Sequence, residues 1–305
     1  MHHVSFKYLR PTTPSEACSL KAKHGKEAFF WAGGTDLVPQ LQEGLIAPNY
    51  CIDMSFIPDF DYIKCGREYI RIGSLTRVAT LETSTDIIHQ IPVLSEAANH
   101  LGSPQIRNMA TIGGNLCNAS PCADLAVALL AFGTELELLS VAGERWVALE
   151  DFYRVDDIQI DISQGEKPTV LNENELLGEI RIPIPSPKTQ FSFSKLRRTA
   201  VDIAIVNTAV SITVNSDGIV SDVKIALGSV APTPMRSRDA ENMLRGVNIS
   251  QIDSALMEMA GYKAAEETRP ITDIRGSAEY RRIISEVMVR QGINQAIQNF
   301  EASKK

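Results

Sequence analysis

The chain has 305 residues, 44% of them hydrophobic and 22% charged, an ordinary balance in a chain long enough for two domains. Its formal net charge of −7 argues against nucleic acid as a main partner. Its five cysteines include no Cys-x-x-Cys pair, which indicates reduced thiols in a cytoplasm. The N-terminus lacks the apolar core of a signal peptide, and no apolar run reaches membrane length, so we expect a cytoplasmic protein without membrane insertion.

Short strands and helices alternate through the first half of the chain. Residues 5–9 predict a strand, and residues 13–25 predict a helix that starts at a capping box with a first-turn proline and ends at a glycine. A strand at residues 50–54 precedes a hairpin at residues 61–73, in which apolar and polar positions alternate. Residues 81–101 have a mainly helical pattern that is broken at a proline.

A loop-rich stretch at residues 156–174 leads into the second half. We expect strands at residues 135–139, 146–149, 176–182, 191–196, 203–214 and 219–227. The sequence Asn-Ser-Asp-Gly at 215–218 is a strong turn signal, so the last strands predict a small antiparallel sheet. Three helices follow: one from Ser237 to Gly246, one capped by Ser250 with Asp253, and one at residues 278–300.

The first of two glycine-rich stretches, residues 29–37, reads Phe-Phe-Trp-Ala-Gly-Gly-Thr-Asp-Leu. Its apolar run predicts a strand that delivers Gly33 and Gly34 to a turn, where backbone N–H groups can approach a ligand closely. The carboxylate of Asp36 would repel a phosphate. We therefore expect this side chain to turn away, toward a sugar hydroxyl or the backbone.

The second stretch, residues 108–125, is the one around which we expect the chain to be organised. Gly113 and Gly114 predict a turn with positive φ and free N–H groups. Ser120-Pro121 predicts the N-cap and first-turn proline of an apolar helix whose first turn contains Asp124. A glycine turn beside a helix N-terminus suits a phosphate, so the two stretches together predict a diphosphate held from both sides. The alternative is that both are ordinary Gly-Gly turns.

Six segments in order along the chain carry a family resemblance: AGGTDL at 32–37, ATIGGN at 110–115, ASPCADL at 119–125, ELLGEIRIP at 175–183, KLRRTAVDIA at 195–204 and PITDIRGSAEYR at 270–281. They resemble the FAD-binding medium subunit of the molybdenum hydroxylases, which include xanthine, carbon monoxide and nicotinate dehydrogenases. The resemblance implies an α+β fold. Residues 1–183 would form a two-part FAD-binding half of the PCMH type. Residues 188–300 would form a small antiparallel sheet packed with helices, the C-terminal domain of the CO dehydrogenase flavoprotein type.

The resemblance also implies an FAD site that draws residues from both halves. The implied cofactor-binding residues are Phe30, Trp31, Ala32, Gly33, Gly34, Thr35, Asp36, Leu37, Leu101, Thr111, Ile112, Gly113, Gly114, Asn115, Asn118, Asp124, Leu177 and Lys195. Plain core roles for Leu101 and Leu177, and a solvated charge for Lys195, are the alternatives. Because neither glycine stretch contains a histidine, we expect the FAD to be non-covalent. Asp273 and Arg275 predict a structural ion pair.

The implied function is that of an electron-transfer subunit. Electrons taken from a substrate at a molybdenum cofactor, on a large partner subunit, would pass through [2Fe–2S] clusters on a small iron–sulfur subunit to FAD. From there they would pass to NAD, with a quinone or a ferredoxin as alternatives. We expect no catalytic residue and no metal ligand on this chain, because the flavin carries the redox chemistry and the five histidines are scattered.

Two other functions stay open on the sequence. One is a stand-alone FAD-dependent reductase of the same fold. The other is a nucleotide-binding module that has kept the glycine stretches and lost the flavin. The substrate of the complex cannot be inferred, since it would bind another subunit.

Overall fold

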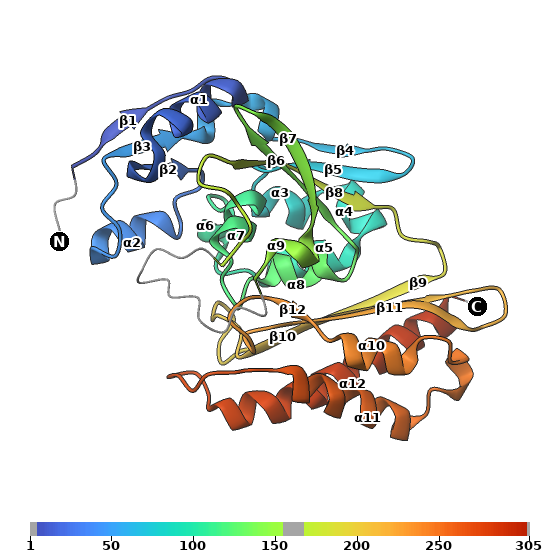
Figure 1. The fold of residues 1–305 in the computed structure, drawn as a ribbon. Coiled ribbons are helices and arrows are strands. Elements are labelled where there is room, and N and C mark those ends of the chain that lie inside the picture. Colours follow the sequence, from blue (N-terminus) through green and yellow to red (C-terminus); the bar gives the residue numbers. More distant parts are fainter. Residues whose placement is uncertain (1–4, 155–167, 304–305) are drawn as a thin grey trace.

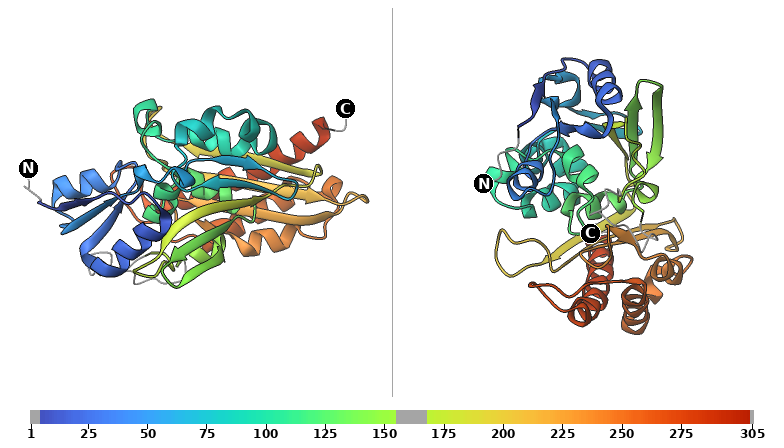
Figure 2. Two further views of the ribbon diagram at one scale, coloured as in Figure 1. Left: turned by 90° about the horizontal axis from the view of Figure 1, so that it is seen from above. Right: turned by 60° about the vertical axis from the view of Figure 1, so that its left-hand side comes forward.

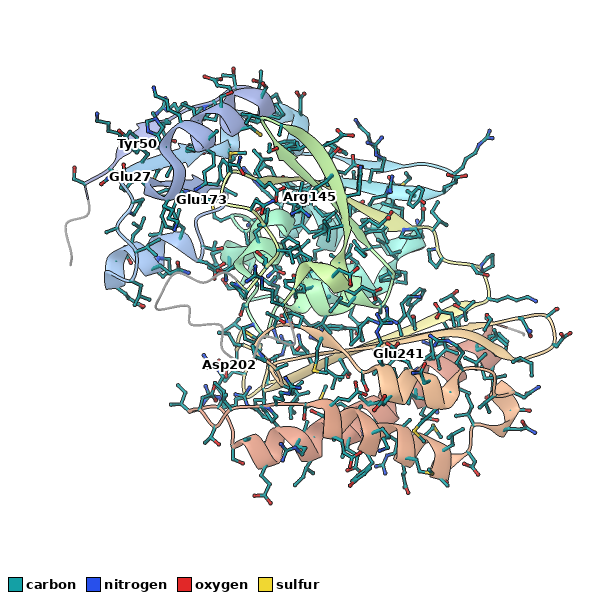
Figure 3. The ribbon with its side chains drawn as sticks, viewed as in Figure 1. Glu27, Tyr50, Arg145, Glu173, Asp202 and Glu241 are labelled. Atoms are coloured by element: carbon teal, nitrogen blue, oxygen red, sulfur yellow. The ribbon has the colours of Figure 1, made fainter. Side chains whose placement is uncertain are left out.

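The computed structural model describes residues 5–154 and 168–303, so most of the predicted loop-rich stretch lies outside the described residues. Figure 1 shows two halves stacked on each other, with the N-terminal elements above and the C-terminal elements below. Side chains fill the space between them, as seen in Figure 3, which labels Arg145 in the upper half and Glu241 in the lower. None of the described helices is both long enough and apolar enough to cross a membrane.

A small parallel sheet opens the chain and ends at the first glycine stretch. Its strands are β1 (Lys7–Leu9), β2 (Ala28–Trp31) and β3 (Tyr50–Asp53), in the order β1-β3-β2, connected through α1 (Pro14–His24) and α2 (Leu37–Glu43). The predicted start of the first helix is confirmed, because the hydroxyl of Thr13 accepts a hydrogen bond from the N–H of Glu16 at 3.2 Å. Its predicted end is confirmed as well, at Gly25 with φ 52°.

A five-stranded antiparallel sheet forms the middle of the upper half. Its strands are β4 (Ile63–Cys65), β5 (Tyr69–Gly73), β6 (Glu135–Ser140), β7 (Gly143–Ala148) and β8 (Leu176–Pro183), in the order β4-β5-β8-β6-β7. The predicted hairpin of β4 and β5 is confirmed. The predicted strand at 146–149 ends one residue early, because Leu149 begins the short helix α9 (Leu149–Phe152).

Short helices pack against the apolar face of this sheet. They are α3 (Val78–Thr83), α4 (Thr85–Gln90), α5 (Pro92–His100), α6 (Pro104–Arg107), α7 (Ile112–Asn118) and α8 (Asp124–Leu130). The predicted break is confirmed, since Pro92 is the first residue of α5. Buried side chains of these helices and of β5, β6 and β8 form the largest apolar core. Every residue of α8 is buried, so this helix lies at the centre of the molecule.

The lower half is a four-stranded antiparallel sheet with helices on its outer face (Figures 1 and 2). Its elements are β9 (Thr189–Leu196), β10 (Val206–Val214), β11 (Val220–Gly228), β12 (Met235–Arg236), α10 (Arg238–Leu244), α11 (Ser254–Glu267) and α12 (Ala278–Ala302). β10 and β11 contact α8 of the upper half and α12 or α10 of the lower half. The predicted sheet and the three helices are therefore confirmed, whereas β12 was not expected.

Two of the predicted helix caps need correction. Ser237 stands at the N-cap of α10, but its hydroxyl donates to Glu267 at 2.8 Å. The carboxylate of Glu267 accepts from the N–H groups of Arg238 and Asp239 instead, at 2.9 Å each. Asp253 alone caps α11, because Ser250 lies in the preceding 3-10 turn. A carboxylate from a distant element thus replaces the local hydroxyl, which local spacing does not reveal.

Candidate functional site

The two glycine stretches lie in direct contact, although 70 residues separate them in the sequence. A Cβ atom built on Gly33 would lie 2.0 Å from the carbonyl oxygen of Met109 and 2.9 Å from the Cα atom of Ala110. Only a glycine permits so close an approach of two backbones. The structure therefore brings together the two stretches that the sequence predicts to share one ligand.

The first glycine loop, residues 32–37, follows directly from β2. Gly34 has φ 71°, and a Cβ atom there would lie 2.8 Å from Nε1 of Trp31, so the loop folds back over this indole. No hydrogen-bond partner among the described residues is shown for the backbone N–H groups of residues 33–37. The loop is partly open to solvent, with only Asp36 classed as exposed. It therefore presents consecutive unused donors, the arrangement that binds an anion.

The flanking side chains of this loop point in different directions. Phe30 packs against the apolar cluster of the N-terminal sheet, and Trp31 contacts Phe6 with ring centroids 6.1 Å apart. Asp36 stands at the N-cap of α2 without making a side-chain cap. Its expected turn toward the backbone is not seen among the described residues, whereas a sugar partner stays a prediction.

The second glycine segment, residues 111–115, differs from its prediction. Gly113 and Gly114 lie inside the first turn of α7, neither has a positive φ, and the cap of the helix is Thr111. The predicted positive-φ turn is wrong because the Thr111 hydroxyl accepts from the N–H of Gly114 at 3.1 Å and starts a helix there. The other early N–H groups are also occupied: that of Gly113 donates to the Ser74 carbonyl at 2.8 Å, and that of Ile112 to the Thr76 carbonyl at 3.0 Å. The N–H of Asn115 donates to the Thr111 carbonyl at 3.0 Å, so the N–H groups of residues 112–115 are all occupied and not free as expected.

The glycines of the second segment permit packing, and its asparagine offers a polar atom. A Cβ atom on Gly113 would lie 2.6 Å from Cβ of Ser74, so α7 approaches this residue closely. Oδ1 of Asn115 is buried and has no hydrogen-bond partner among the described residues. An unpaired buried acceptor costs about 1–3 kcal/mol, so a ligand hydroxyl or N–H at this atom would be favoured. Asn118, at the end of α7, is exposed.

The chain turns between α7 and α8 in a way that the sequence did not predict. Ala119 has φ 51°, and α8 begins at Asp124 with Ala123 as its cap, so the predicted cap at Ser120 and first-turn position of Pro121 are wrong. The carbonyl of Pro121 instead accepts from the N–H of Ser229 in the lower half, at 2.7 Å. This contact with the lower half thus explains why the helix starts at Asp124 and not at Pro121. The expectation that Asp124 lies in the first turn is confirmed.

A buried polar cluster joins the halves at the start of α8. Nζ of Lys195, on β9, donates to Oδ2 of Asp124 at 2.7 Å and to the carbonyl of His100 at 2.9 Å. The two charged side chains are only 2% and 5% exposed, so the alternative of a solvated Lys195 is wrong. Asn207, on β10, donates from Nδ2 to Oδ1 of Asp124 at 2.8 Å. Burial raises the pKa of Asp124, and the nearby Lys195 and Asn207 oppose this rise.

Sequence reasoning missed two members of this cluster, His100 and Asn207. Nδ1 of His100 and Oδ1 of Asn207 are buried without a partner in the described part of the chain. Burial, Arg197 and Lys195 lower the pKa of His100. The one available signal was an asparagine inside a run, residues 203–210, whose only other polar residue is Thr208. Leu101 packs against the main core at the end of α5, and Leu177 is buried in it opposite Leu138 of β6.

The last resembling segment forms a structural network. Asp273 pairs with Arg275 at 3.0 Å and with Arg281 at 2.6 Å, so the predicted ion pair is confirmed and extended. Burial raises the pKa of Asp273, but hydrogen bonds from these arginines outweigh it and bring it to about 2. Arg281 also donates to the carbonyl of Ser229 at 2.8 Å. Because the N–H of Ser229 donates to the carbonyl of Pro121, this network helps to fix the turn before Asp124.

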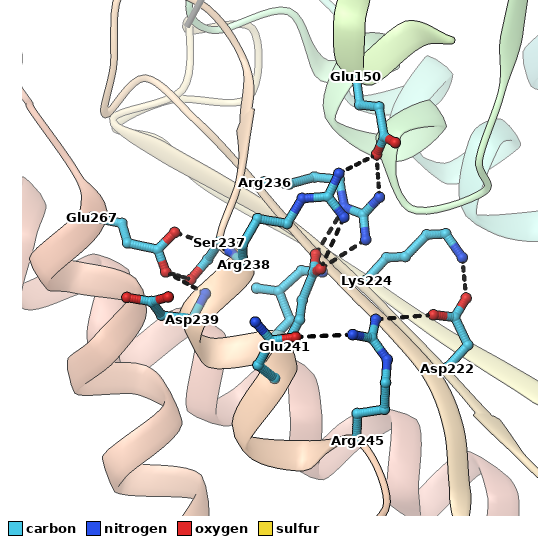
Figure 4. Close-up of polar contacts among 12 residues, drawn as sticks. Glu150, Asp222, Lys224, Arg236, Ser237, Arg238, Asp239, Glu241, Arg245 and Glu267 are labelled. Carbon is cyan, nitrogen blue, oxygen red and sulfur yellow. Dashed lines mark hydrogen bonds and ion pairs between the residues drawn. The ribbon is translucent and has the colours of Figure 1, made fainter. Parts of the chain in front are cut away.

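A second ion-pair cluster joins the halves away from the glycine stretches (Figure 4). Glu150 of α9 accepts from Arg236 and, at 2.6 Å, from Arg238, while Glu241 accepts from Arg236 at 2.7 Å. A groove of about 340 Å³ beside it is lined by Leu130, Glu150 and Arg236 among others, and by none of the predicted site residues. This cluster therefore connects the halves without belonging to the candidate site. Within residues 5–154 and 168–303, no group of three or more potential ligand side chains is placed to hold a metal ion.

Comparison with known proteins gives matches over nearly the whole chain. The family described as FAD binding domain in molybdopterin dehydrogenase matches residues 4–185, and the one described as CO dehydrogenase flavoprotein C-terminal domain matches residues 191–296. The chain is 32% identical to the carbon monoxide dehydrogenase medium chain of Afipia carboxidovorans, covering 96% of each protein. It is 28% identical to the xanthine dehydrogenase FAD-binding subunit of Escherichia coli O157:H7, covering 95% of each.

The fold is also found among solved structures. A chain in the crystal structure of the cyanide-inactivated Cu,Mo-CO dehydrogenase superposes with a TM-score of 0.89 at 32% identity, covering 98% of this chain and 99% of the other. This likeness and the two family matches confirm the predicted α+β fold class, an FAD-binding part followed by an antiparallel sheet with helices.

Proposed function

We propose a function from one premise: this chain belongs to the family of FAD-binding medium subunits of the molybdenum hydroxylases. It is accordingly the FAD-binding subunit of a multi-subunit, molybdenum-dependent oxidoreductase, and the molybdenum cofactor is held by partner subunits. The observation that supports a more detailed proposal is the first glycine loop, which has unused N–H donors and contacts Met109 and Ala110 just before the second glycine segment.

The hydrogen-bonding groups around the two glycine stretches suit the chemistry of FAD. The N–H groups of residues 33–37 offer a row of donors to the diphosphate, which matters because neither glycine stretch contains a lysine or arginine. The unpaired Oδ1 of Asn115 offers an acceptor to a hydroxyl or N–H of the cofactor. We propose that the whole predicted set takes part, with Phe30–Leu37, Leu101, Thr111–Asn115, Asn118, Asp124, Leu177 and Lys195 around the cofactor.

Bound FAD supplies the redox chemistry, accepting and donating electrons. The residues of this chain bind and orient it, and we propose no catalytic acid or base among them. The first loop fixes the diphosphate, while the buried Asp124–Lys195 pair sets a charged environment between the halves. We place a domain boundary between residues 183 and 188, where β8 ends and β9 has not begun.

The subunit would relay electrons within its complex. We propose that they arrive from iron–sulfur clusters on a small partner, which receive them from a large molybdenum subunit, and that they leave to NAD. The relatives' names, medium chain and FAD-binding subunit, favour such a relay over a stand-alone reductase. We also propose a cytoplasmic location, consistent with five cysteines that form no disulfide within the described residues.

The purified chain tests this proposal directly. We expect it to carry FAD, and acid precipitation should leave the yellow colour in the supernatant because the flavin is non-covalent. Alone it should oxidise no purine, aldehyde or N-heterocycle, and adding the cluster and molybdenum subunits should restore turnover from substrate to NAD. Substrate oxidation by the chain alone would favour a stand-alone flavoenzyme. A colourless protein that takes up no FAD would favour the flavin-free module.

A further inference from the structure

Three neighbouring strands of the lower sheet, β9, β10 and β11, place a lysine, an asparagine and a glycine side by side next to the start of α8. Asn207 of β10 is paired with Lys195 of β9 on one side and with Gly228 of β11 on the other. Residues directly opposite on adjacent strands point to the same face of a sheet, so the three positions form one line across it. The face is the one that contacts α8, where Asp124 is the first helical residue.

Asn207 holds one half of the Asp124 carboxylate. Its Nδ2 donates to Oδ1 of Asp124 at 2.8 Å, while Nζ of Lys195 donates to Oδ2 at 2.7 Å. Each carboxylate oxygen is therefore fixed by a different strand. Asn207 is fully buried, at 0% exposure, so no water can take over its hydrogen bond without opening the core. A buried carboxylate that lost this donor would rotate or take up a proton, and would neutralise Lys195 less well.

On the neighbouring strand β11, the missing side chain of Gly228 leaves space for the Asn207 amide. A Cβ atom on Gly228 would lie 2.3 Å from Oδ1 of Asn207 and 2.7 Å from Cγ2 of Val127 on α8. A side chain at this position would displace the asparagine or the helix. The next residue, Ser229, donates from its N–H to the carbonyl of Pro121 at 2.7 Å, so β11 also fixes the turn that leads into Asp124.

We propose that Asn207 is a positioning residue of the flavin site: it holds Asp124 in the orientation in which the carboxylate pairs with Lys195, and so sets the charge that the bound flavin meets. The inference rests on the proposed function, in which Asp124 and Lys195 flank FAD. The main observation behind it is that fully buried Asn207 donates to Asp124, in a space that the missing side chain of Gly228 on the next strand leaves open. Asn207 acts through Asp124 and does not itself need to touch the cofactor.

The test compares Asn207→Leu with Thr208→Val. Thr208 is the next residue of β10, is equally buried, and faces the other side of the sheet, where its hydroxyl lies 3.0 Å from that of Ser194. Each variant thus removes one buried polar contact of the same strand. We would measure the melting temperature of the FAD-free protein, the dissociation constant of FAD, and the two-electron midpoint potential of the bound flavin.

Both variants should lower the melting temperature, but only Asn207→Leu should change the flavin. We expect FAD binding to weaken by roughly tenfold, because an Asp124 carboxylate that has rotated or taken up a proton would no longer pair with Lys195 as the cofactor requires. The potential should shift by about 30 mV for each tenfold difference between the weakening for oxidised and for reduced flavin. Equal FAD affinity and equal potential in the two variants would overturn the proposal.

An exchange of the two side chains keeps the proposal testable if Asn207→Leu does not fold. The double variant Asp124→Asn with Asn207→Asp retains one carboxylate and one amide beside Lys195, so it should fold. It moves the carboxylate from helix to strand, so FAD affinity and potential should stay altered. Full recovery of both flavin properties would refute a positioning role. Failure of the unmodified protein to bind FAD would instead refute the proposed function.

Discussion

Two short sequences in this chain look alike and are used in opposite ways. Each contains Gly-Gly followed by a polar residue, and each follows an apolar residue or run. In the first glycine loop the backbone leaves a strand, Gly34 takes φ 71°, and the N–H groups of residues 33–37 have no partner among the described residues. In the second glycine segment the same dipeptide enters a helix, and the N–H groups of residues 112–115 are all occupied.

The difference shows that a glycine pair in a sequence does not by itself predict a ligand-binding turn, because it can equally permit close packing. In the first loop the glycines give the backbone freedom to expose donors. In the second segment the missing side chain of Gly113 lets α7 approach Ser74 closely. The two donor turns that the sequence suggested are therefore replaced by one donor loop, which contacts Met109 and Ala110 just before the packed helix α7.

The largest effect should come from Gly33→Ala, which breaks the contact between the two regions. The new methyl group would meet the Met109 carbonyl at 2.0 Å, and neither backbone can move without distorting the loop. We expect FAD binding to weaken by about a hundredfold or more, since several hydrogen bonds to charged phosphate are lost together. Titration of FAD fluorescence measures this. The matched control is Gly276→Ala, whose methyl group would meet nothing closer than 3.5 Å; equal affinities in the two variants would contradict the account.

Replacing the two glycines of the second segment by alanine should have different effects on the free energy of unfolding. In Gly113→Ala the added carbon would lie 2.6 Å from Cβ of Ser74, so overpacking should lower the free energy of unfolding by about 1–3 kcal/mol. In Gly114→Ala the nearest contact is Oγ1 of Thr111 at 3.0 Å, and alanine favours the helix by about 1 kcal/mol. Urea unfolding of the FAD-free proteins should thus show a clear loss only for Gly113→Ala. Equal losses would mean that the segment is not packed in this way.

Asn115→Leu should act on binding rather than on folding. Leucine removes an unpaired buried oxygen, so the free energy of unfolding without FAD should stay unchanged or rise. FAD affinity should fall roughly tenfold, the value of one hydrogen bond. Asn118→Leu changes an exposed residue of the same helix and should have a smaller effect on affinity. A lower stability together with unchanged affinity for Asn115→Leu would assign this residue to the fold alone.

The smallest effect should distinguish the two threonines. Thr111 caps α7, so Thr111→Val should lower the free energy of unfolding by about 1 kcal/mol. No hydrogen bond among the described residues is shown for the hydroxyl of Thr35, and Thr35→Val should leave the unfolding of the FAD-free protein unchanged. Denaturation curves of the two variants check this. A destabilised Thr35→Val protein would show that the first loop is held by its own side chains.

Local pattern predicted most of the fold, because caps, turns and alternation act over a few residues. The hairpin of β4 and β5, the helix from Thr13 to Gly25 and the long final helix all follow from such signals. The pairing of β8 between β5 and β6, and the late start of α8 at Asp124, depend on partners far along the chain. Local spacing carries no information about such partners.

The candidate site divides in the same way. Its two glycine stretches stand out in the sequence, and the family resemblance adds Asp124 and Lys195, which the structure joins in one ion pair. Asn207 escaped notice because its partners lie on another helix and on two neighbouring strands. The conformation of Gly113 and Gly114 was misjudged because a threonine cap decides between a turn and a helix.

Amide hydrogen exchange with and without FAD tests the central claim most directly, because it reports on the N–H groups of both regions in one experiment. Without FAD, the amides of residues 33–37 should exchange rapidly and those of residues 112–115 slowly, since only the latter are hydrogen-bonded. Addition of FAD should slow exchange in the first loop by roughly tenfold or more, with little change in the second segment. Protection that rises in residues 112–115 while residues 33–37 stay unprotected would contradict the account.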